Sequence, residues 1–154
     1  MKKILFLIIF LAFLGIETTA RAEVNVEIDI KPGSDPNCFN INGHGVVPVA
    51  ILGSDVFDVN DIDTGSLFFA GLAVRVRGNR GPLYSYEFVN DDIHLDMVCH
   101  FEDDPTAWTA GNGVTAELSG SLLDGTPFKG TDSICVVQEV DDGGPPCVPP
   151  CGSL

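Results

Sequence analysis

The stretch VTAELSGSLLDGTPFKG, residues 114–130, decides the fold class because alternating residues lead into a tight-turn signal. From Val114 to Leu118 apolar and polar residues alternate, which is the period of a strand with one buried face. The Asp124-Gly125 pair is a strong hairpin signal, and residues 126–130 are expected to form the return strand. The stretch therefore predicts an antiparallel hairpin.

Similar strand signals occur along the rest of the chain, separated by turn residues, and no segment has a helical period. Pro48 lies inside one apolar run and cannot donate a hydrogen bond to a neighbouring strand, so that run is predicted to be an edge or bulged strand. The sequence predicts an all-β fold, a single antiparallel β-sandwich of the immunoglobulin-like or Greek-key type. The further predicted strands are residues 24–30, 46–52, 66–70, 73–77, 83–89, 93–101 and 133–140.

The first 22 residues have the features of a cleavable secretory signal peptide. Lys2 and Lys3 precede an apolar run over residues 4–16, and Ala20 and Ala22 form a small-residue cleavage site. The apolar run is shorter than the roughly 20 residues that a membrane-spanning helix needs. We expect cleavage after Ala22, no membrane span afterwards, and a secreted or periplasmic protein.

The composition divides the chain into three predicted segments: a signal peptide at 1–22, a β-sandwich domain at 23–140 and a tail at 141–154. The tail is rich in proline, glycine and cysteine, a composition typical of a disordered or extended chain. The net charge of −14 repels phosphate backbones, so no nucleic-acid partner is expected. The expected partner is an extracellular protein or a glycan.

The chain has five cysteines, and export would permit disulfide bonds. An odd number leaves at least one thiol unpaired within the chain or paired with another molecule. Within the predicted domain, Cys135 is expected to pair with either Cys38 or Cys99. In the tail, Cys147 and Cys151 are expected to pair with each other or to remain available.

Four segments carry a resemblance that spans about residues 24–140. They are IDIKPGS at 28–34, GVVPVAILGS at 45–54, FDVNDID at 57–63 and GTDSI at 130–134. Together they resemble a β-rich module of secreted microbial proteins, which occurs alone or beside other extracellular modules. The resemblance implies export and a β-rich fold, and it implies no particular activity.

The same resemblance implies a calcium loop. Such modules often carry the pattern D-V-N-G-D-G-x-x-D-L-V, with oxygen ligands at positions 1, 3, 5 and 9. In this chain Asn90, Asp92 and Asp96 keep the third, fifth and ninth positions. Phe88 replaces the first carboxylate and Ile93 replaces the turn glycine, so the expected calcium binding is weak. The alternative is a turn held by hydrogen bonds from Asx side chains.

Two other acidic clusters lie in segments rich in turn-forming residues. Each could help to hold a cation if the fold brings it near another cluster, and is otherwise a solvated loop. The first cluster is Asp55, Asp58, Asn60, Asp61 and Asp63, and the second is Glu102, Asp103 and Asp104.

No catalytic pattern is present in the sequence. His94 and His100 are about 20 Å apart if they lie on one strand, which is too far for one metal ion, and His44 lies in a glycine-rich loop. Neither a nucleophile elbow, a zinc-protease helix nor a phosphate loop occurs. The chain is therefore predicted not to be an enzyme, and a small extracellular hydrolase is the least favoured alternative.

The favoured hypothesis is a secreted, non-catalytic structural or interaction module that presents acidic loops. The alternative is a module that binds a carbohydrate or another cell-surface ligand by stacking on aromatic rings. Trp108, Tyr84 and Tyr86 are the candidate stacking residues. Exposed, coplanar rings would support that alternative, whereas rings that fill the core would remove it.

Overall fold

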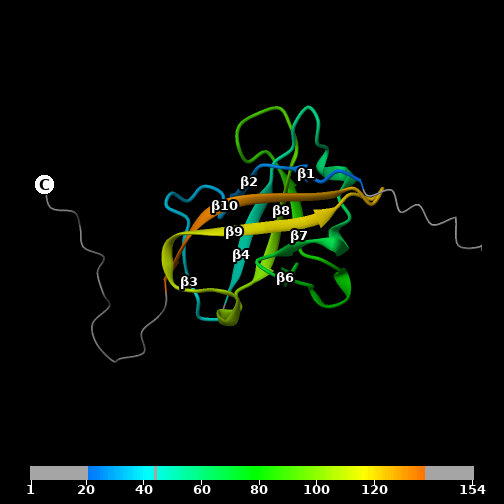
Figure 1. Ribbon diagram of the computed structural model, residues 1–154. Helices are drawn as coiled ribbons and strands as arrows, with labels where there is room; N and C mark the ends of the chain where they lie inside the picture. The colour runs from blue at the N-terminus through cyan, green and yellow to red at the C-terminus, as the bar shows by residue number, and fades with distance from the viewer. Residues whose placement is uncertain (1–20, 44, 138–154) are drawn as a thin grey trace, which may run out of the picture.

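The computed structural model describes residues 21–43 and 45–137 of the 154-residue chain and contains two β-sheets (Figure 1). The prediction of a mostly β protein is confirmed. The first sheet runs in the order β1-β10-β9-β5-β6, with β3 also paired to β10, and the second runs β2-β4-β8-β7. The first sheet comprises β1 (Val24–Asn25), β3 (Cys38–Asn40), β5 (Phe68–Phe69), β6 (Leu72–Ala73), β9 (Gly111–Ser121) and β10 (Pro127–Val137). The second comprises β2 (Ile28–Ile30), β4 (Val46–Ile51), β7 (Tyr84–Glu87) and β8 (Asp96–Glu102).

The helical segments within the described residues are all single 3-10 turns. They connect strands rather than forming a layer of their own. Their bounds are η1 (Val59–Asp61), η2 (Thr64–Ser66), η3 (Gly78–Arg80) and η4 (Pro105–Ala107). No described helix has the length and apolar character needed to cross a membrane.

The predicted hairpin is present as β9 and β10, which pair antiparallel on either side of the Asp124-Gly125 turn. Gly125 has a φ of +85°, a left-handed conformation that glycine adopts without steric cost. The two strands predicted at 126–130 and 133–140 are one strand over its described length, with a register shift between Ile134 and Val136. Residues 138–140 of that prediction lie outside the described residues.

The strand predicted at residues 24–30 is divided between the two sheets. β1 pairs parallel to β10, whereas β2 pairs antiparallel to β4. Between them, the Val26 N–H donates to the Lys129 carbonyl, and the Leu52 N–H donates to the Glu27 carbonyl. The chain therefore passes from one sheet to the other at these two residues. The parallel pairing of β1 and of β3 with β10 departs from the predicted antiparallel arrangement.

The prediction of an edge or bulged strand around Pro48 was wrong, because β4 lies between β2 and β8 and pairs with both in continuous register. The Pro48 carbonyl accepts a hydrogen bond from the Lys31 N–H, just beyond the end of β2. In an antiparallel strand the backbone N and C=O of one residue point toward the same neighbouring strand. The backbone N of Pro48, which carries no hydrogen, therefore points toward the β2 side, where β2 has already ended, and no hydrogen bond to β8 is lost. An internal strand can therefore accommodate proline here.

One hydrophobic cluster lies between the inward faces of the two sheets. Alternation within the predicted strand 93–101 puts Leu95, Met97, Cys99 and Phe101 on one face, and the last three are fully buried. On the opposite face of β8, Asp96 and Val98 are buried as well. The first sheet contributes Phe69 from β5 and Leu118 from β9, which are also fully buried. The strand predicted at 66–70 contains only the two-residue strand β5, and the strand predicted at 73–77 shares only Ala73 with β6 and otherwise has isolated bridges at Val74 and Val76.

A disulfide bond joins Cys38 on β3 to Cys135 on β10, residues that are directly opposite each other in the parallel ladder. Of the two pairings left open by the sequence, the structure has the one with Cys38. Cys99 is a free thiol in the core, and burial raises its pKa to about 12. Cys147 and Cys151 lie outside the described residues.

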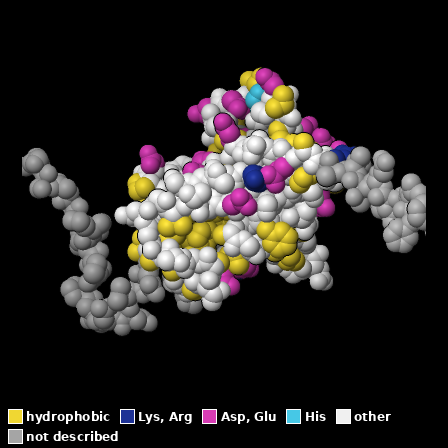
Figure 2. All heavy atoms as spheres, in the orientation of Figure 1, with side chains coloured by type: hydrophobic (Ala, Val, Ile, Leu, Met, Phe, Trp, Pro, Cys, Tyr) yellow, Lys and Arg dark blue, Asp and Glu magenta, His cyan; other side chains and the backbone are white. Residues whose placement is uncertain are grey.

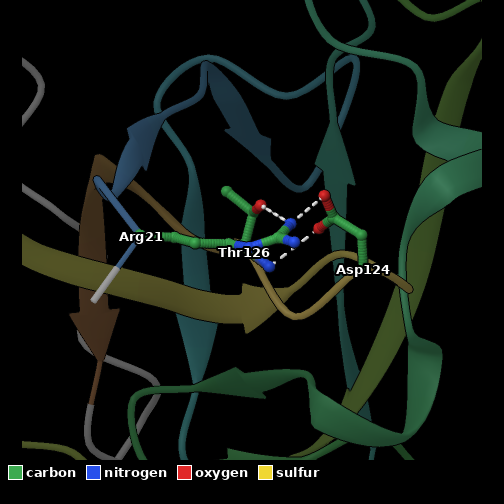
Figure 3. Close-up of polar contacts among 3 residues, drawn as sticks. All are labelled: Arg21, Asp124 and Thr126. Atoms are coloured by element: carbon green, nitrogen blue, oxygen red, sulfur yellow. Dashed lines mark hydrogen bonds and ion pairs between the residues drawn. The ribbon is translucent and has the colours of Figure 1, made fainter. Parts of the chain in front are cut away.

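The N-terminal residues of the described chain are held against the β9–β10 hairpin. Figure 3 shows the Arg21 guanidinium donating to the Asp124 carboxylate and to the Thr126 hydroxyl, the latter at 3.0 Å. Two residues further on, Glu23 forms an ion pair of 2.6 Å with Lys129 on β10. Arg21 falls within the predicted signal peptide, whose first 20 residues lie outside the described residues.

Candidate interaction site at the loop end

Two segments that are far apart in the sequence, one of them acidic, form the walls of one groove. The groove has a volume of about 600 Å³ and is lined by residues 53–58, 60 and 61 on one side and 93–95 on the other. Figure 2 shows carboxylates, apolar side chains and a histidine gathered on the protrusion at the top of the molecule. The fold thus brings the cluster that begins at Asp55 beside the predicted calcium loop.

The first wall is an ordered turn anchored in the core. Ser54 and Phe57 exchange two backbone hydrogen bonds, and the Phe57 side chain is buried. The Asp58 carboxylate then caps η1 by accepting from the Asn60 N–H at 2.9 Å and from the Asn60 side chain at 2.8 Å. These hydrogen bonds stabilise the charged form and lower the pKa of Asp58.

The second wall is held by hydrogen bonds among its own polar groups. The Asn90 side-chain amide donates to Asp92 Oδ2 at 2.9 Å, and Asp92 Oδ1 accepts from the His94 N–H at 2.7 Å. Between them Asp91 adopts a positive φ of 59°, where a glycine would meet less resistance. Asn90 and Asp92, two of the three predicted calcium ligands, therefore lie together in a loop with Asx-type hydrogen bonds.

The third predicted ligand, Asp96, has a different environment. It is fully buried, and it accepts from the Gly53 N–H at 2.9 Å and from the Val89 N–H at 2.8 Å. One oxygen therefore bonds to the backbone of the first wall, and the other bonds to the backbone just before the loop of the second wall. Among the described residues, no three His, Cys, Asp or Glu side chains come together in a way that could hold a metal ion.

One polar contact crosses the groove, and each wall also carries an exposed apolar side chain. His94 Nε2 lies 3.5 Å from Asp55 Oδ1 and so connects the two walls. Val56 on one wall is 91% exposed and Ile93 on the other is 88% exposed. Sequence reasoning missed this pair, although an apolar residue directly after an aspartate in each turn-rich segment was a usable signal.

The predicted stacking residues are not arranged as a ligand platform. Trp108 is buried, with ring centroids 5.1 Å from Phe39 and 5.4 Å from Phe69, so the expectation that it could stack on a ligand was wrong. Tyr84 and Tyr86 share one face of β7, are half exposed, and meet edge to face at 81° rather than lying coplanar.

Among the described residues, the other acidic residues and histidines that the sequence singled out do not contribute to this groove. Asp103 is buried and accepts from the N–H groups of Asn42 and Gly43, and Asp104 caps η4 through Thr106. His100 lies on β8, paired with Pro48, and does not line the groove that contains His94. His44 lies outside the described residues.

Comparison of the chain with protein-family models, with curated proteins and with solved structures found no match. The functional assignment therefore depends on the chemistry of the groove itself. That chemistry combines fixed negative charge with two exposed apolar side chains on facing loops.

Proposed function

We propose that the protein is an exported, non-catalytic interaction module that binds a partner protein in the groove between residues 53–61 and 93–95. The observation that carries the proposal is the pair Val56 and Ile93, two almost fully exposed apolar side chains that line a groove whose carboxylates, Asp55, Asp58 and Asp61, come from the wall of Val56. Apolar groups rimmed by polar ones are typical of surfaces that bind other proteins. The two sheets around one core, which we assign to the immunoglobulin-like sandwich class, would supply a rigid support for the loops.

The charge of the groove defines the chemistry of the partner. Asp55, Asp58 and Asp61 line one wall, and the pKa of Asp58 is lowered, so this wall is negative at neutral pH. The best complement is a polypeptide segment in which lysine or arginine alternates with apolar residues. The net charge of −14 would also steer such a segment toward the protein.

Weak calcium binding remains part of this proposal. Calcium at Asn90 and Asp92 would fix the second wall, with backbone carbonyls or water completing the six to eight oxygens that calcium requires. The carbohydrate alternative is weaker, because Trp108 is in the core and the two tyrosines are not coplanar.

The test uses synthetic peptides that alternate leucine with either lysine or glutamate. We expect the lysine peptide to bind and the glutamate peptide not to bind in isothermal titration calorimetry. Ile93→Ser should weaken binding of the lysine peptide about tenfold, the effect of removing a central apolar contact. Leu123→Ser is the matched control, because Leu123 is 71% exposed but does not line the groove. Equal binding of both peptides, or equal effects of the two substitutions, would refute the proposal.

A further inference from the structure

The strand β7 forms one edge of the second sheet, and its outer side pairs with no other described strand. The His100 N–H donates to the Leu83 carbonyl, and the register continues with Ser85 opposite Val98. In an antiparallel ladder, alternate residues face the partner strand, so the N–H and C=O groups of Tyr84 and Tyr86 point away from β8. Within residues 21–43 and 45–137, these groups have no backbone partner on that side.

Aromatic side chains are exposed along this edge. Tyr84 is 39% exposed, Tyr86 is 43% exposed, and Phe88 just beyond the strand is 62% exposed. Natural proteins commonly protect an edge strand with lysine, proline or a covering segment. The described part of β7 instead combines free hydrogen-bonding groups with large side chains that gain stability from burial.

The two ends of β7 carry opposite charge. Arg75, Arg77 and Arg80 lie in the hairpin that precedes the strand, where the Leu83 N–H donates to the Arg75 carbonyl. Among the described residues Arg75 pairs with Glu102, whereas Arg77 and Arg80 are exposed without an ion pair. At the other end Glu87 is followed by the exposed residues Asp91 and Asp92. These arginines are notable in a chain whose net charge is −14.

We propose that β7 is a self-association edge, on which two copies of this chain pair antiparallel about a two-fold axis at Ser85. Tyr84 of one copy then lies opposite Tyr86 of the other, and the outward backbone groups of both residues form a hydrogen-bonded ladder across the axis. The antiparallel order places the arginine-rich start of each strand against the acidic end of the second copy. This charge complementarity favours a second copy over an unrelated strand as the occupant.

The geometry limits the assembly to a dimer. An isologous contact uses the same edge of both copies, so pairing consumes both β7 edges and leaves none for a third chain. Cross-strand tyrosine pairs would cover the half-exposed rings on one face of the extended sheet. This surface is distinct from the groove, so the inference does not depend on the proposed partner protein.

The first experiment is sedimentation velocity over a range of concentrations, with protein expressed from the full sequence and a non-reducing gel to exclude disulfide-linked dimers. We expect a reversible dimer. Tyr86→Pro removes an outward N–H from each copy without removing a bond to β8, and should weaken the dimer about tenfold or more. Tyr86→Val removes the ring and keeps the N–H, so it should weaken the dimer less. A monomer at every concentration, or equal effects of the two variants, would overturn the inference.

A charge exchange tests the antiparallel order even if Tyr86→Pro fails to fold. Glu87→Arg and Arg80→Glu should each weaken the dimer several-fold, the scale of exposed ion pairs, and the double variant should recover affinity. Glu117→Arg on β9 makes the same change in charge as Glu87→Arg but is away from β7, and should leave the dimer unweakened. Failure of the double variant to recover, or equal weakening by Glu117→Arg, would contradict the proposed arrangement.

Discussion

The Gly53 N–H donates a 2.9 Å hydrogen bond to Asp96 Oδ1, joining residues that are 43 positions apart. The second oxygen of the same carboxylate accepts from Val89, and the Asp96 side chain is fully buried. One carboxylate at the start of β8 therefore connects the first wall of the groove, at Gly53, to Val89, which precedes the loop of the second wall. A residue that the sequence marks as a calcium ligand also has a structural role that the sequence did not reveal.

Asp96→Ala should lower the free energy of unfolding by about 2–5 kcal/mol, because it leaves the buried Gly53 N–H and the half-buried Val89 N–H without an acceptor. Asp96→Asn keeps one acceptor oxygen and should cost less. Asp55→Ala is the control, since the Asp55 side chain is 93% exposed, and its effect should stay within about 0.5 kcal/mol. Urea unfolding measures all three, and a loss for Asp96→Ala no larger than the control would contradict the structural role.

Gly53→Ala should also destabilise the fold, by about 1–3 kcal/mol or more, because of a close approach between two chain segments. A Cβ atom at Gly53 would lie 2.3 Å from the Leu95 carbonyl oxygen, so the backbone would have to move. Gly45→Ala is the matched control, because a Cβ atom there meets nothing within 4 Å. Thermal unfolding that ranks the two variants equally would show that the contact is unimportant.

Cys99 predicts a pH dependence of stability at alkaline pH. Burial raises the pKa of this thiol from 9.0 to about 12 in the folded protein. Between these values the unfolded chain loses the proton while the folded chain keeps it, so stability falls as pH rises, by up to about 1.4 kcal/mol per pH unit. Below pH 9 the contribution is fully present. Cys99→Ala lacks this component, and urea unfolding from about pH 8 to about pH 11 should show a steeper decline for the wild type. If the stability of the wild type and of Cys99→Ala declines equally with pH, the Cys99 thiol does not contribute to the pH dependence.

Calcium should raise the melting temperature more than magnesium does at equal ionic strength, if the loop of Asn90 and Asp92 binds it. Binding to the folded state stabilises by mass action, and magnesium is a poor substitute because it requires tighter octahedral geometry. Asp92→Ala should remove the difference between the two ions. If both ions act equally on the wild type and on this variant, the loop is a turn without a calcium site.

The predicted cleavage after Ala22 can be tested from the N-terminus of the mature protein. N-terminal sequencing of protein recovered outside the cell should begin at Glu23, which retains its ion pair with Lys129 and loses the contacts of Arg21. The Asp124 carboxylate would keep the two hydrogen bonds from Thr126, which are the largest causes of its lowered pKa. Secreted protein that begins at Met1 would refute the prediction.

The sequence could predict the features that depend on local pattern. Alternation identified the buried face of β8, and the Asp124-Gly125 pair identified the β9–β10 hairpin, because strand period and turn chemistry depend on neighbouring residues. Strand pairing at long range could not be predicted in this way. Alternation through residues 24–30 is the same whether they form one strand or two, so the change of sheet at Val26 left no signal.

The sequence could identify the two loops of the candidate site, but it could not show that they lie side by side. Turn-forming carboxylates marked both loops in the sequence, yet only the antiparallel pairing of β4 with β8 brings Gly53 beside Leu95. Trp108 was misassigned because a ring in a loop can face either solvent or the core, and its neighbours Phe39 and Phe69 come from distant segments.

The pairing of β1 and β3 with β10 has a consequence for synthesis on the ribosome. Both early strands find their partner only in residues 127–137, and the Cys38–Cys135 bond closes across 97 positions. A chain that emerges from its N-terminus must therefore hold these strands without their partner until nearly all of the described domain has been made. The first sheet can therefore be completed only late in synthesis, when residues 127–137 become available to β1 and β3.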